Sequence, residues 1–416
     1  MIKKGVFKLL SINNTFLKKL KFILLALLVI SLPFSVALAN ILCGLLLLYW
    51  LLFYDNKKEL LSLFKKNPIV FFAYLFFLSF LISLIWSDNL ERGFEVIKKE
   101  LLLLFIPIFM MLIEKGEEKV LIKLFIFSMS ILVFISYLVY FGVLDFISKT
   151  FEITPTPYTP FMTHISYNPF LALAIYLLIY YFFKVKKIKL KIFIALLIIL
   201  MSINMFITGG RAGQVAFFVL LLVAFFQFIR ISILKTVIFL FSLASIFILT
   251  YNFSPLFKER VNGVIYEVNN LEKSRNRSVG LRITMWENSI RIIKNNPIFG
   301  VGVGDFSKEY KKVSEKYTPN AISDVFQPHN MYLFVWTSNG IFSLLILFIL
   351  FFIQIFISFR KNDEFKPIRL ALAILFLVIM FYDSYLLGFH TTLLFVIFTS
   401  ILYKNTNWND IKQKTY

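Results

Sequence analysis

Long apolar runs alternate with short polar breaks along almost the whole chain. A run of about 20 apolar residues is long enough to span the roughly 30 Å hydrocarbon core of a bilayer. The pattern therefore predicts an all-α polytopic integral membrane protein with about twelve transmembrane helices. We place these helices at residues 22–39, 41–54, 69–86, 100–113, 121–143, 167–183, 192–208, 213–229, 235–251, 330–358, 368–387 and 390–403. The second, fourth and last runs are short, and a re-entrant segment is an alternative for them.

The positions of the lysines and arginines orient these helices. Loops rich in Lys and Arg are retained on the cytoplasmic side, and basic clusters such as those at 55–66 and 184–191 recur on alternate loops. The pattern predicts cytoplasmic termini and one large external loop. The chain then divides into helices 1–9 at 1–251, a periplasmic loop with amphipathic helices at 252–328, and helices 10–12 with a cytoplasmic tail at 329–416.

Composition supports this class of protein. Hydrophobic residues make up 59% of the chain and charged residues only 16%, which excludes an ordinary soluble domain. The net charge of +21 needs no nucleic acid partner, because cytoplasmic loops facing anionic membrane lipids account for most of it. The single cysteine, Cys43, excludes an internal disulfide and a cysteine metal cluster. We expect neither a metal nor a cofactor.

The stretch FITGGRAGQVAFF, residues 206–218, places Arg211 in a Gly-Gly turn between two apolar runs. A charged side chain near hydrocarbon is costly, so it usually serves a function there. The N–H groups of the glycines and the positive end of the next helix favour a bound anion. We interpret Arg211 as part of an anion site. The alternative is an arginine that merely extends its charge to the membrane surface.

Residues 278–306 of the large loop predict an amphipathic helix, since apolar positions recur at helical spacing. These positions are Leu281, Met285, Ile290 and Ile293, with Trp286 beside them. Arg282 and Arg291 fall on the more polar faces. The helix should end at 295–297, where Asn-Asn-Pro occurs, and the glycines at 300, 302 and 304 should form a flexible turn. They lack the preceding strand of a dinucleotide site.

One of the three histidines, His329, is a candidate for proton transfer. His329 lies between Pro328 and Asn330 at the predicted start of the tenth membrane helix, on the external side. An imidazole there can accept a proton, although a histidine that only caps the helix end is the alternative. His164 and His390 fall on the same side, but each lacks comparable surroundings in the sequence.

Three segments together resemble the O-antigen ligase family of bacterial inner-membrane proteins. They are TGGRAGQ after one apolar run, GLRITMWENSIRIIKNNPIFGVGVGDF in the large loop, and PHNMYLFVWTSNGIFSLL at the next run. The family's histidine motif is His, then Asn, Ser or Gln, nine residues, Gly, two residues, and Gly, Thr or Tyr. His329, Asn330 and Gly340 match it, whereas Ser343 departs from its last position. The specific part of the resemblance runs from about 208 to 345.

This resemblance implies a GT-C-like glycosyltransferase that needs no metal and no nucleotide sugar. The donor would be a glycan on undecaprenyl diphosphate, and the acceptor a sugar hydroxyl of the lipid A core. By similarity, Arg211 and Arg282 would bind the diphosphate, where arginine forks replace a metal cation. His329 would be the catalytic residue and activate or orient the acceptor hydroxyl. We place Asn330, Trp286, Arg291 and His164 in supporting roles.

Other functions stay open at this point. A polymerase that joins O-antigen repeat units would share the donor chemistry, and an oligosaccharyltransferase would deliver the glycan to a protein. A membrane transporter is the alternative from another class. It fits less well, because the two halves show no obvious repeat and no ionisable residue other than Asp383 lies well inside a predicted span. The histidine motif favours the ligase over the polymerase.

Overall fold

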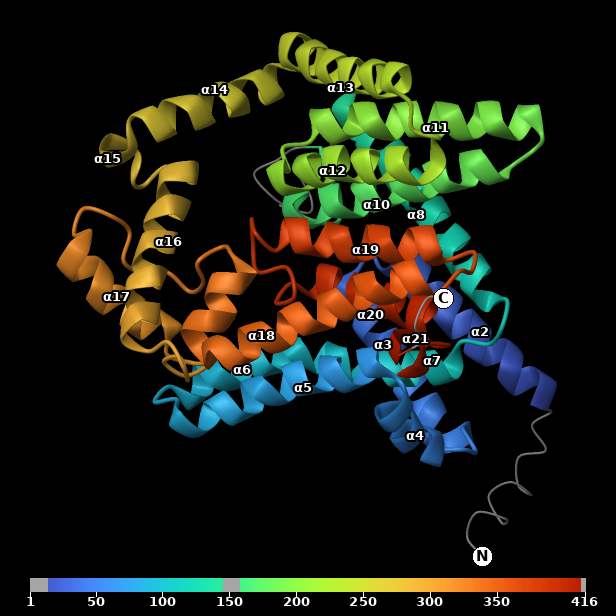
Figure 1. Cartoon of the computed structure of the whole chain (residues 1–416), viewed down its shortest axis with the longest axis horizontal. Helices are drawn as coiled ribbons and strands as arrows, with labels where there is room; N and C mark the ends of the chain where they lie inside the picture. The colour runs from blue at the N-terminus through green and yellow to red at the C-terminus, as the bar shows by residue number, and fades with distance from the viewer. Residues whose placement is uncertain (1–13, 145–157, 413–416) are drawn as a thin grey trace, which may run out of the picture.

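The computed structural model describes residues 14–144 and 158–412, which are helical or irregular with no β-strand (Figure 1). Each predicted apolar run corresponds to a helical segment. Eight of these segments are long and apolar enough to cross a membrane. This supports a multi-pass membrane protein, whereas the number of crossings stays a prediction. The eight are α3 (Val36–Phe53), α5 with η1 (Pro68–Trp86), α8 (Glu117–Tyr140), α10 (His164–Lys184), α11 (Ile188–Ile207), α12 (Arg211–Phe228), α13 (Ile233–Phe253) and α18 (Met331–Arg360).

The remaining apolar segments are shorter or more charged, and several lie inside the bundle. Helix α20 (Phe389–Tyr403) is buried along almost its whole length, so few of its residues face lipid. It packs against α7 (Phe105–Leu112) and the preceding turn η2 (Leu101–Leu104). The other two apolar segments are α2 (Asn14–Ser31) and α19 (Lys366–Ile379).

Two predicted helix boundaries are wrong. The first run does not continue to residue 39, because a turn containing Pro33 separates α2 from α3, and the Ser35 side chain caps α3 by accepting from Leu38 N at 3.2 Å. A proline cannot continue a helix hydrogen-bond ladder. Likewise α19 ends at Ile379 rather than at residue 387. Residues 380–388 form an irregular stretch instead, so Asp383 does not lie within a membrane helix.

Helix α18 is interrupted at Gly340, where the sequence predicts a continuous helix. Gly340 has a φ of 81°, and a Cβ there would lie 1.9 Å from the carbonyl oxygen of Ile298. Only glycine tolerates this combination of dihedral angle and close approach. The segment after α16 packs against α18 at this interruption. Val301 N donates to Thr337 O there at 2.8 Å. The turn predicted at the 300–304 glycines is present, but it is packed against α18 rather than free.

Four helices gather at one end of the bundle, which we name the loop end (Figure 1). They are α14 (Pro255–Asn269), α15 (Leu271–Ser274), α16 (Ser278–Asn295) and α17 (Phe306–Tyr317). The amphipathic helix predicted in this loop is confirmed as α16, which ends at Asn295. Its buried face includes Met285 and Ile293 as predicted, but Ile290 is exposed, so that assignment is wrong.

A short amphipathic helix, α6 (Leu90–Glu100), was not predicted, and the large loop holds its start in place. The carboxylate of Asp305 accepts from Ser87 Oγ at 2.8 Å and from the backbone N–H groups of Asp88 at 2.8 Å and Asn89 at 3.0 Å. A carboxylate at a helix N-terminus satisfies unpaired N–H groups and complements the helix dipole. The loop between α16 and α17 and the start of α6 thus form one packed unit.

The other end of the bundle, which we name the basic-loop end, pairs its buried cations with carboxylates. Arg369 lies 2.6 Å from Asp363, and Lys404 lies 2.8 Å from Glu118. Lys21 is also buried and contacts two glutamates. Here α4 (Lys58–Lys66) and α21 (Asn409–Lys412) cover the helix ends. These buried cations are thus neutralised locally.

Candidate active site

His329 immediately precedes α18, and its position is fixed by the residues on both sides of it. Asn330 caps the helix through its side chain, which accepts from Leu333 N at 3.1 Å. His329 itself has a φ of 48°, a left-handed conformation that is uncommon for residues other than glycine. Such backbone conformations are often found at functional sites. The imidazole is 36% exposed, so a substrate can reach it.

The partner of His329 is Asp383, from the irregular stretch between α19 and α20. The distance between His329 Nδ1 and Asp383 Oδ1 is 3.0 Å. A carboxylate beside Nδ1 favours the tautomer in which Nδ1 carries the proton, which leaves Nε2 able to accept another proton. Asp383 is itself buried, and it accepts from Ser384 N at 2.7 Å. The arrangement suits a general base.

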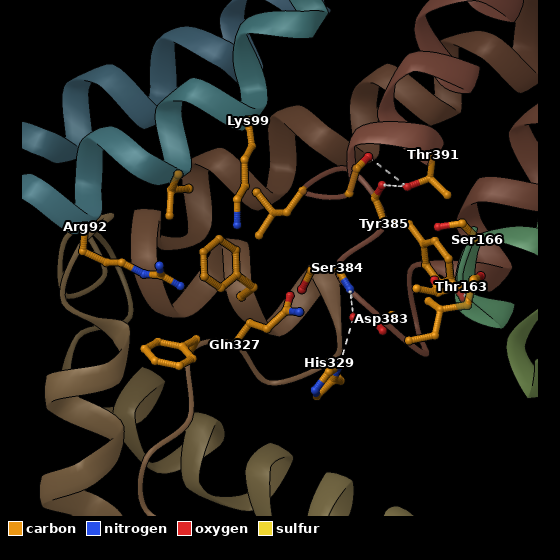
Figure 2. A pocket seen from close by; sticks show the side chains of 16 residues that line it. Arg92, Lys99, Thr163, Ser166, Gln327, His329, Asp383, Ser384, Tyr385 and Thr391 are labelled. Atoms are coloured by element: carbon orange, nitrogen blue, oxygen red, sulfur yellow. Dashed lines mark hydrogen bonds and ion pairs between the residues drawn. The ribbon is translucent and has the colours of Figure 1, made fainter. Parts of the chain in front are cut away.

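A cavity of about 390 Å³ opens beside this pair (Figure 2). Its wall comes from α6, from the start of α10, from the segment before α18 and from the irregular stretch 380–388. We name it the histidine pocket. Burial and the nearby Asp383 hold the pKa of the Tyr385 phenol in this wall well above its ordinary value, so the phenol stays neutral. It donates to the carbonyl oxygen of Ile165 at 3.1 Å.

Trp286 connects α16 to both members of the histidine pair. Its indole Nε1 donates to the carbonyl oxygen of Pro328 at 3.1 Å, one residue before His329. Its ring meets Phe381 edge-on at a centroid distance of 5.1 Å, two residues before Asp383. Trp286 therefore holds the two segments that carry the pair, which agrees with the supporting role that the sequence suggests.

Three arginines from different helices form a cluster near the start of α10. Arg211 begins α12, Arg260 lies in α14 and Arg282 lies in α16. All three are within electrostatic range of His164, the first residue of α10. The structure thus brings together Arg211, Arg282 and His164 from the sequence prediction. It also adds Arg260, and it shows that His164 does not stand alone as its sequence surroundings suggest.

The arginine cluster has no counter-ion among the residues that the structure describes. None of the three guanidinium groups makes a hydrogen bond or an ion pair there, and the Nε atom of each is buried without a partner. The Glu267 carboxylate acts electrostatically on Arg211, but it accepts from Val279 N at 2.6 Å. Buried polar groups normally have partners, so unsatisfied arginine donors that converge indicate a binding site for an anion.

The arginine cluster borders the histidine pocket. Thr163 and Ser166, which flank His164, line the pocket. Arg282 also acts electrostatically on Tyr385 in the pocket wall. An anion held by the arginines would therefore lie beside the space that His329 faces.

The glycines next to Arg211 have a packing role. A Cβ on Gly210 would lie 2.4 Å from the carbonyl oxygen of His164, and one on Gly213 would lie 2.3 Å from the Asn168 side chain. Glycine at both positions lets α12 approach α10 closely. Asn168 Nδ2 then donates to Gly210 O at 3.1 Å, which fixes the position of Arg211. A direct role of the glycine N–H groups in anion binding stays a prediction.

Two other sequence candidates do not line the histidine pocket, although Thr391 beside His390 does. Arg291 donates to Asn288 Oδ1 at 2.7 Å and stacks over the Tyr317 ring at 5.2 Å, so it connects α16 to α17. His390 is packed between Phe170 and Phe389 in the bundle. In the part of the chain described, no group of three or more His, Cys, Asp or Glu residues has the geometry for a metal ion.

An apolar groove of about 880 Å³ lies between α8, α11, α12 and α13. Phe206 and Ser254 line it, and these residues precede Arg211 and Arg260 by only a few positions in the chain. Helix α13, which forms one side, has no buried residue. The groove therefore adjoins the arginine cluster and opens toward the surface where lipid would lie.

Sequence reasoning missed four side chains that the structure adds to the site. Arg260 is one cation among many in the large loop, and Arg92 and Lys99 belong to the helix that was not predicted. Nothing in their local sequence distinguishes them. Asp383 did carry a signal, because it is an acid within a long apolar stretch. Its contact with His329 spans 54 positions and could not be read from that signal.

Comparison with known proteins supports the resemblance seen in the sequence. Residues 196–348 match a protein family described as O-antigen ligase. The matched segment contains Arg211, Arg260, Arg282 and His329, and its helices form much of the site. A protein of Haemophilus influenzae, described only as uncharacterized, is 28% identical over 321 residues, which are 75% of this chain and 77% of that relative. The family match supports a membrane glycosyltransferase of the ligase or polymerase type.

Proposed function

From this family match, we propose that the protein is an O-antigen ligase. It would transfer a glycan from undecaprenyl diphosphate to a sugar hydroxyl of the lipid A core. The observation that carries the proposal is the position of three unpaired arginines next to a histidine that a carboxylate orients. A transferase with a diphosphate leaving group needs these two elements side by side.

The arginine cluster is the donor site in this proposal. Arg211, Arg260 and Arg282 would bind the diphosphate through charge-assisted hydrogen bonds. The apolar groove beside them would accommodate the first part of the polyprenyl chain, because it is apolar and open toward lipid. The arginines would also stabilise the charge that develops on the diphosphate as it leaves, so the proposed reaction requires no metal ion.

His329 acts on the acceptor. The acceptor hydroxyl oxygen attacks the anomeric carbon of the donor, and its proton passes to His329 Nε2. The bond from the anomeric carbon to the phosphate oxygen breaks, and undecaprenyl diphosphate leaves with the electron pair. A glycosidic bond to the acceptor has then formed. Asp383 stabilises the resulting imidazolium through Nδ1–H.

The proposed location is the bacterial inner membrane, with the loop end in the periplasm. The basic-loop end would face the cytoplasm, in agreement with the positive-inside rule. Both substrates are lipid-anchored and would approach the loop end within the membrane. Membrane lipids are thus partners of the chain, and no nucleic acid is involved.

Deletion of the gene followed by gel analysis of lipopolysaccharide tests the proposal. Loss of a ligase leaves bare lipid A core while lipid-linked polymer accumulates. Loss of a polymerase instead leaves core that bears a single repeat unit, and an unchanged lipopolysaccharide with loss of a glycosylated protein indicates an oligosaccharyltransferase. Unchanged glycans in every fraction would contradict a glycosyltransferase.

Reconstitution provides the direct measurement. The purified chain in proteoliposomes should transfer labelled glycan from undecaprenyl diphosphate to lipid A core. Addition of a chelator should leave the rate unchanged, because arginines take the place of a metal in the proposed mechanism. A strong loss of rate with chelator would contradict the assignment of Arg211, Arg260 and Arg282 as the groups that neutralise the leaving diphosphate.

A further inference from the structure

The wall of the histidine pocket opposite the arginine cluster is also cationic. Arg92, Val96 and Lys99 of α6 line the pocket at spacings of four and three residues, so they occupy one face of the helix. Figure 2 shows the Arg92 and Lys99 side chains extending from α6 toward the pocket, with His329 and Asp383 on the far side. The reaction described above gives these two cations no role.

Neither cation is neutralised within the pocket. Lys99 makes no hydrogen bond or ion pair with the residues that the structure describes. Arg92 pairs with Glu95 on the outer side of α6, where the glutamate is half-exposed, and it stacks over the Phe326 ring at 4.7 Å. Among the residues that line the pocket, Asp383 is the only acid, and it is engaged by His329.

The backbone of the α6 wall is held in a fixed position, and Arg92 and the exposed Lys99 extend from it. The Asn89 side chain caps the helix by accepting from Arg92 N at 3.0 Å, and Asp305 binds the residues just before it. Gly93 packs directly against the α16–α17 segment, where an added Cβ would lie 3.2 Å from Val303 and 2.5 Å from Leu84. Phe326 also connects Arg92 to the segment that leads into His329. Arg92, which stacks on Phe326, is thus preorganised, which lowers the entropic cost of binding an anion.

The donor cannot account for this wall. Its single diphosphate belongs with the three arginines, because they adjoin the apolar groove for the lipid chain. The α6 wall lies on the other side of His329, where the acceptor hydroxyl must approach. In addition, the outer face of α6 exposes Leu90 and Phe94, which suits contact with the acyl chains of a lipid-anchored acceptor.

We propose that Arg92 and Lys99 form a subsite for an anionic substituent, a phosphate or a carboxylate, on the acceptor sugars. The subsite rests on the proposed transferase function and identifies its acceptor as an acidic glycolipid. Binding of the anion by α6 orients the acceptor so that one hydroxyl faces His329 Nε2. The two groups of cations thus bind different substrates. The arginine cluster binds the diphosphate of the donor, and α6 binds the anion of the acceptor.

Steady-state kinetics with the double variant Arg92→Gln/Lys99→Gln tests the subsite. We expect the KM for lipid A core to rise about 10-fold or more, since two charge-assisted hydrogen bonds are lost. The KM for the donor should stay within about twofold, and kcat should fall if the anion also orients the acceptor hydroxyl. Lys98→Gln is the matched control, because Lys98 is exposed on the same helix and does not line the pocket. It should behave as the unmodified chain.

Chemically altered acceptors then identify the anion. Lipid A core stripped of phosphate, or with its sugar carboxylates reduced, should bind the unmodified chain as weakly as intact core binds the double variant. The altered group that causes this loss is the ligand of α6, and the double variant should show no further loss with that acceptor. Equal KM values for all acceptors, or a rise in donor KM in the double variant, would overturn the subsite.

A binding assay separates this subsite from the transferase proposal. Lipid A core in vesicles should bind the reconstituted chain, and the double variant should bind it about 10-fold more weakly. If no transfer occurs but this difference in binding is found, the ligase proposal fails and the subsite stands. If transfer occurs and the difference is absent, the subsite fails and the ligase proposal stands.

Discussion

The two ends of the helical bundle hold partly buried cations in opposite ways. At the basic-loop end, Arg369 is 1% exposed and its guanidinium contacts Asp363 at 2.6 and 3.0 Å. At the loop end, Arg211, Arg260 and Arg282 make no such contact within the described residues. A paired cation secures the fold, whereas unpaired cations that repel one another reduce stability. The difference teaches that pairing, rather than burial or charge alone, distinguishes the end at which we propose a ligand site.

The largest expected contrast between the two ends is in the activity of a fused reporter enzyme, which is active on one side of the membrane and inactive on the other. We expect an alkaline phosphatase fusion at Lys273 in the loop end to be active and one at Lys187 in the basic-loop end to be inactive. The reason is that cationic loops resist export. Enzyme activity on cell colonies measures the outcome. The reverse pattern would place the arginine cluster in the cytoplasm and remove the proposed access to lipid A core.

The next largest effect should come from His329→Ala. Loss of a general base lowers a rate by about 100-fold to 10,000-fold, so the variant should lack visible ligation. Its melting temperature in detergent should stay close to that of the unmodified chain, because the side chain is partly exposed. His390→Ala is the control and should retain ligation. Polymer-capped lipopolysaccharide in the variant would show that His329 only shapes the start of α18.

Asp383→Asn should have a smaller effect than loss of the histidine. The amide preserves the shape of the side chain but no longer stabilises a protonated imidazole, and loss of such a supporting contact commonly costs about 10-fold to 100-fold. We expect kcat to fall while the donor KM is unchanged. Rates measured from pH 5 to 9 check this. An undiminished kcat at every pH would mean that the 3.0 Å contact with His329 has no catalytic role.

Arg282→Lys tests whether the loop end requires the planar arginine fork. A lysine keeps the charge but cannot form two parallel hydrogen bonds with a diphosphate, so we expect kcat/KM for the donor to fall about 10-fold. Arg291→Lys is the matched control on the same helix and should have little effect, since Arg291 faces α17. Identical kinetics of the two variants would leave Arg282 with a general electrostatic role.

The smallest effect on transfer should come from Arg369→Met, which acts on stability instead. The change leaves Asp363 and two backbone carbonyls without their donor, at a cost of about 1–3 kcal/mol, because Asp363 is itself partly exposed. Arg260→Met at the loop end should do the opposite and lower transfer without lowering the melting temperature. Thermal unfolding of both variants measures the contrast. Equal destabilisation would remove the distinction between the two ends.

Much of this arrangement could be predicted from the sequence, because it depends on local patterns. Apolar runs gave the helical segments, and the surroundings of Arg211, Arg282 and His329 singled them out. The break at Gly340 could not be predicted, since it depends on a close approach of Ile298 from another segment. Helix α6 escaped detection for a related reason. Its short amphipathic pattern adjoins an apolar run, and Asp305, which binds the residues just before it, lies far along the chain.

The same limit applies within the site. Arg260 and His164 look unremarkable in their own segments, and only the packing of α10, α12, α14 and α16 brings them together. The contact between His329 and Asp383 depends on the early end of α19, which an apolar pattern running to residue 387 conceals. Patterns along the chain reveal which residues differ from their neighbours, whereas the partners of those residues follow from tertiary contacts.

The contact of Asp305 with the residues before α6 also sets an order of events during biosynthesis. Ser87 and Asp305 are 218 positions apart, so a ribosome adding about 5–20 residues per second needs roughly 10 to 40 seconds between them. During that interval the start of α6 lacks its carboxylate, and the pocket wall cannot take its final position. Membrane insertion of the early helices therefore precedes completion of the site. A chain interrupted within the large loop would integrate into the membrane but carry no finished acceptor wall.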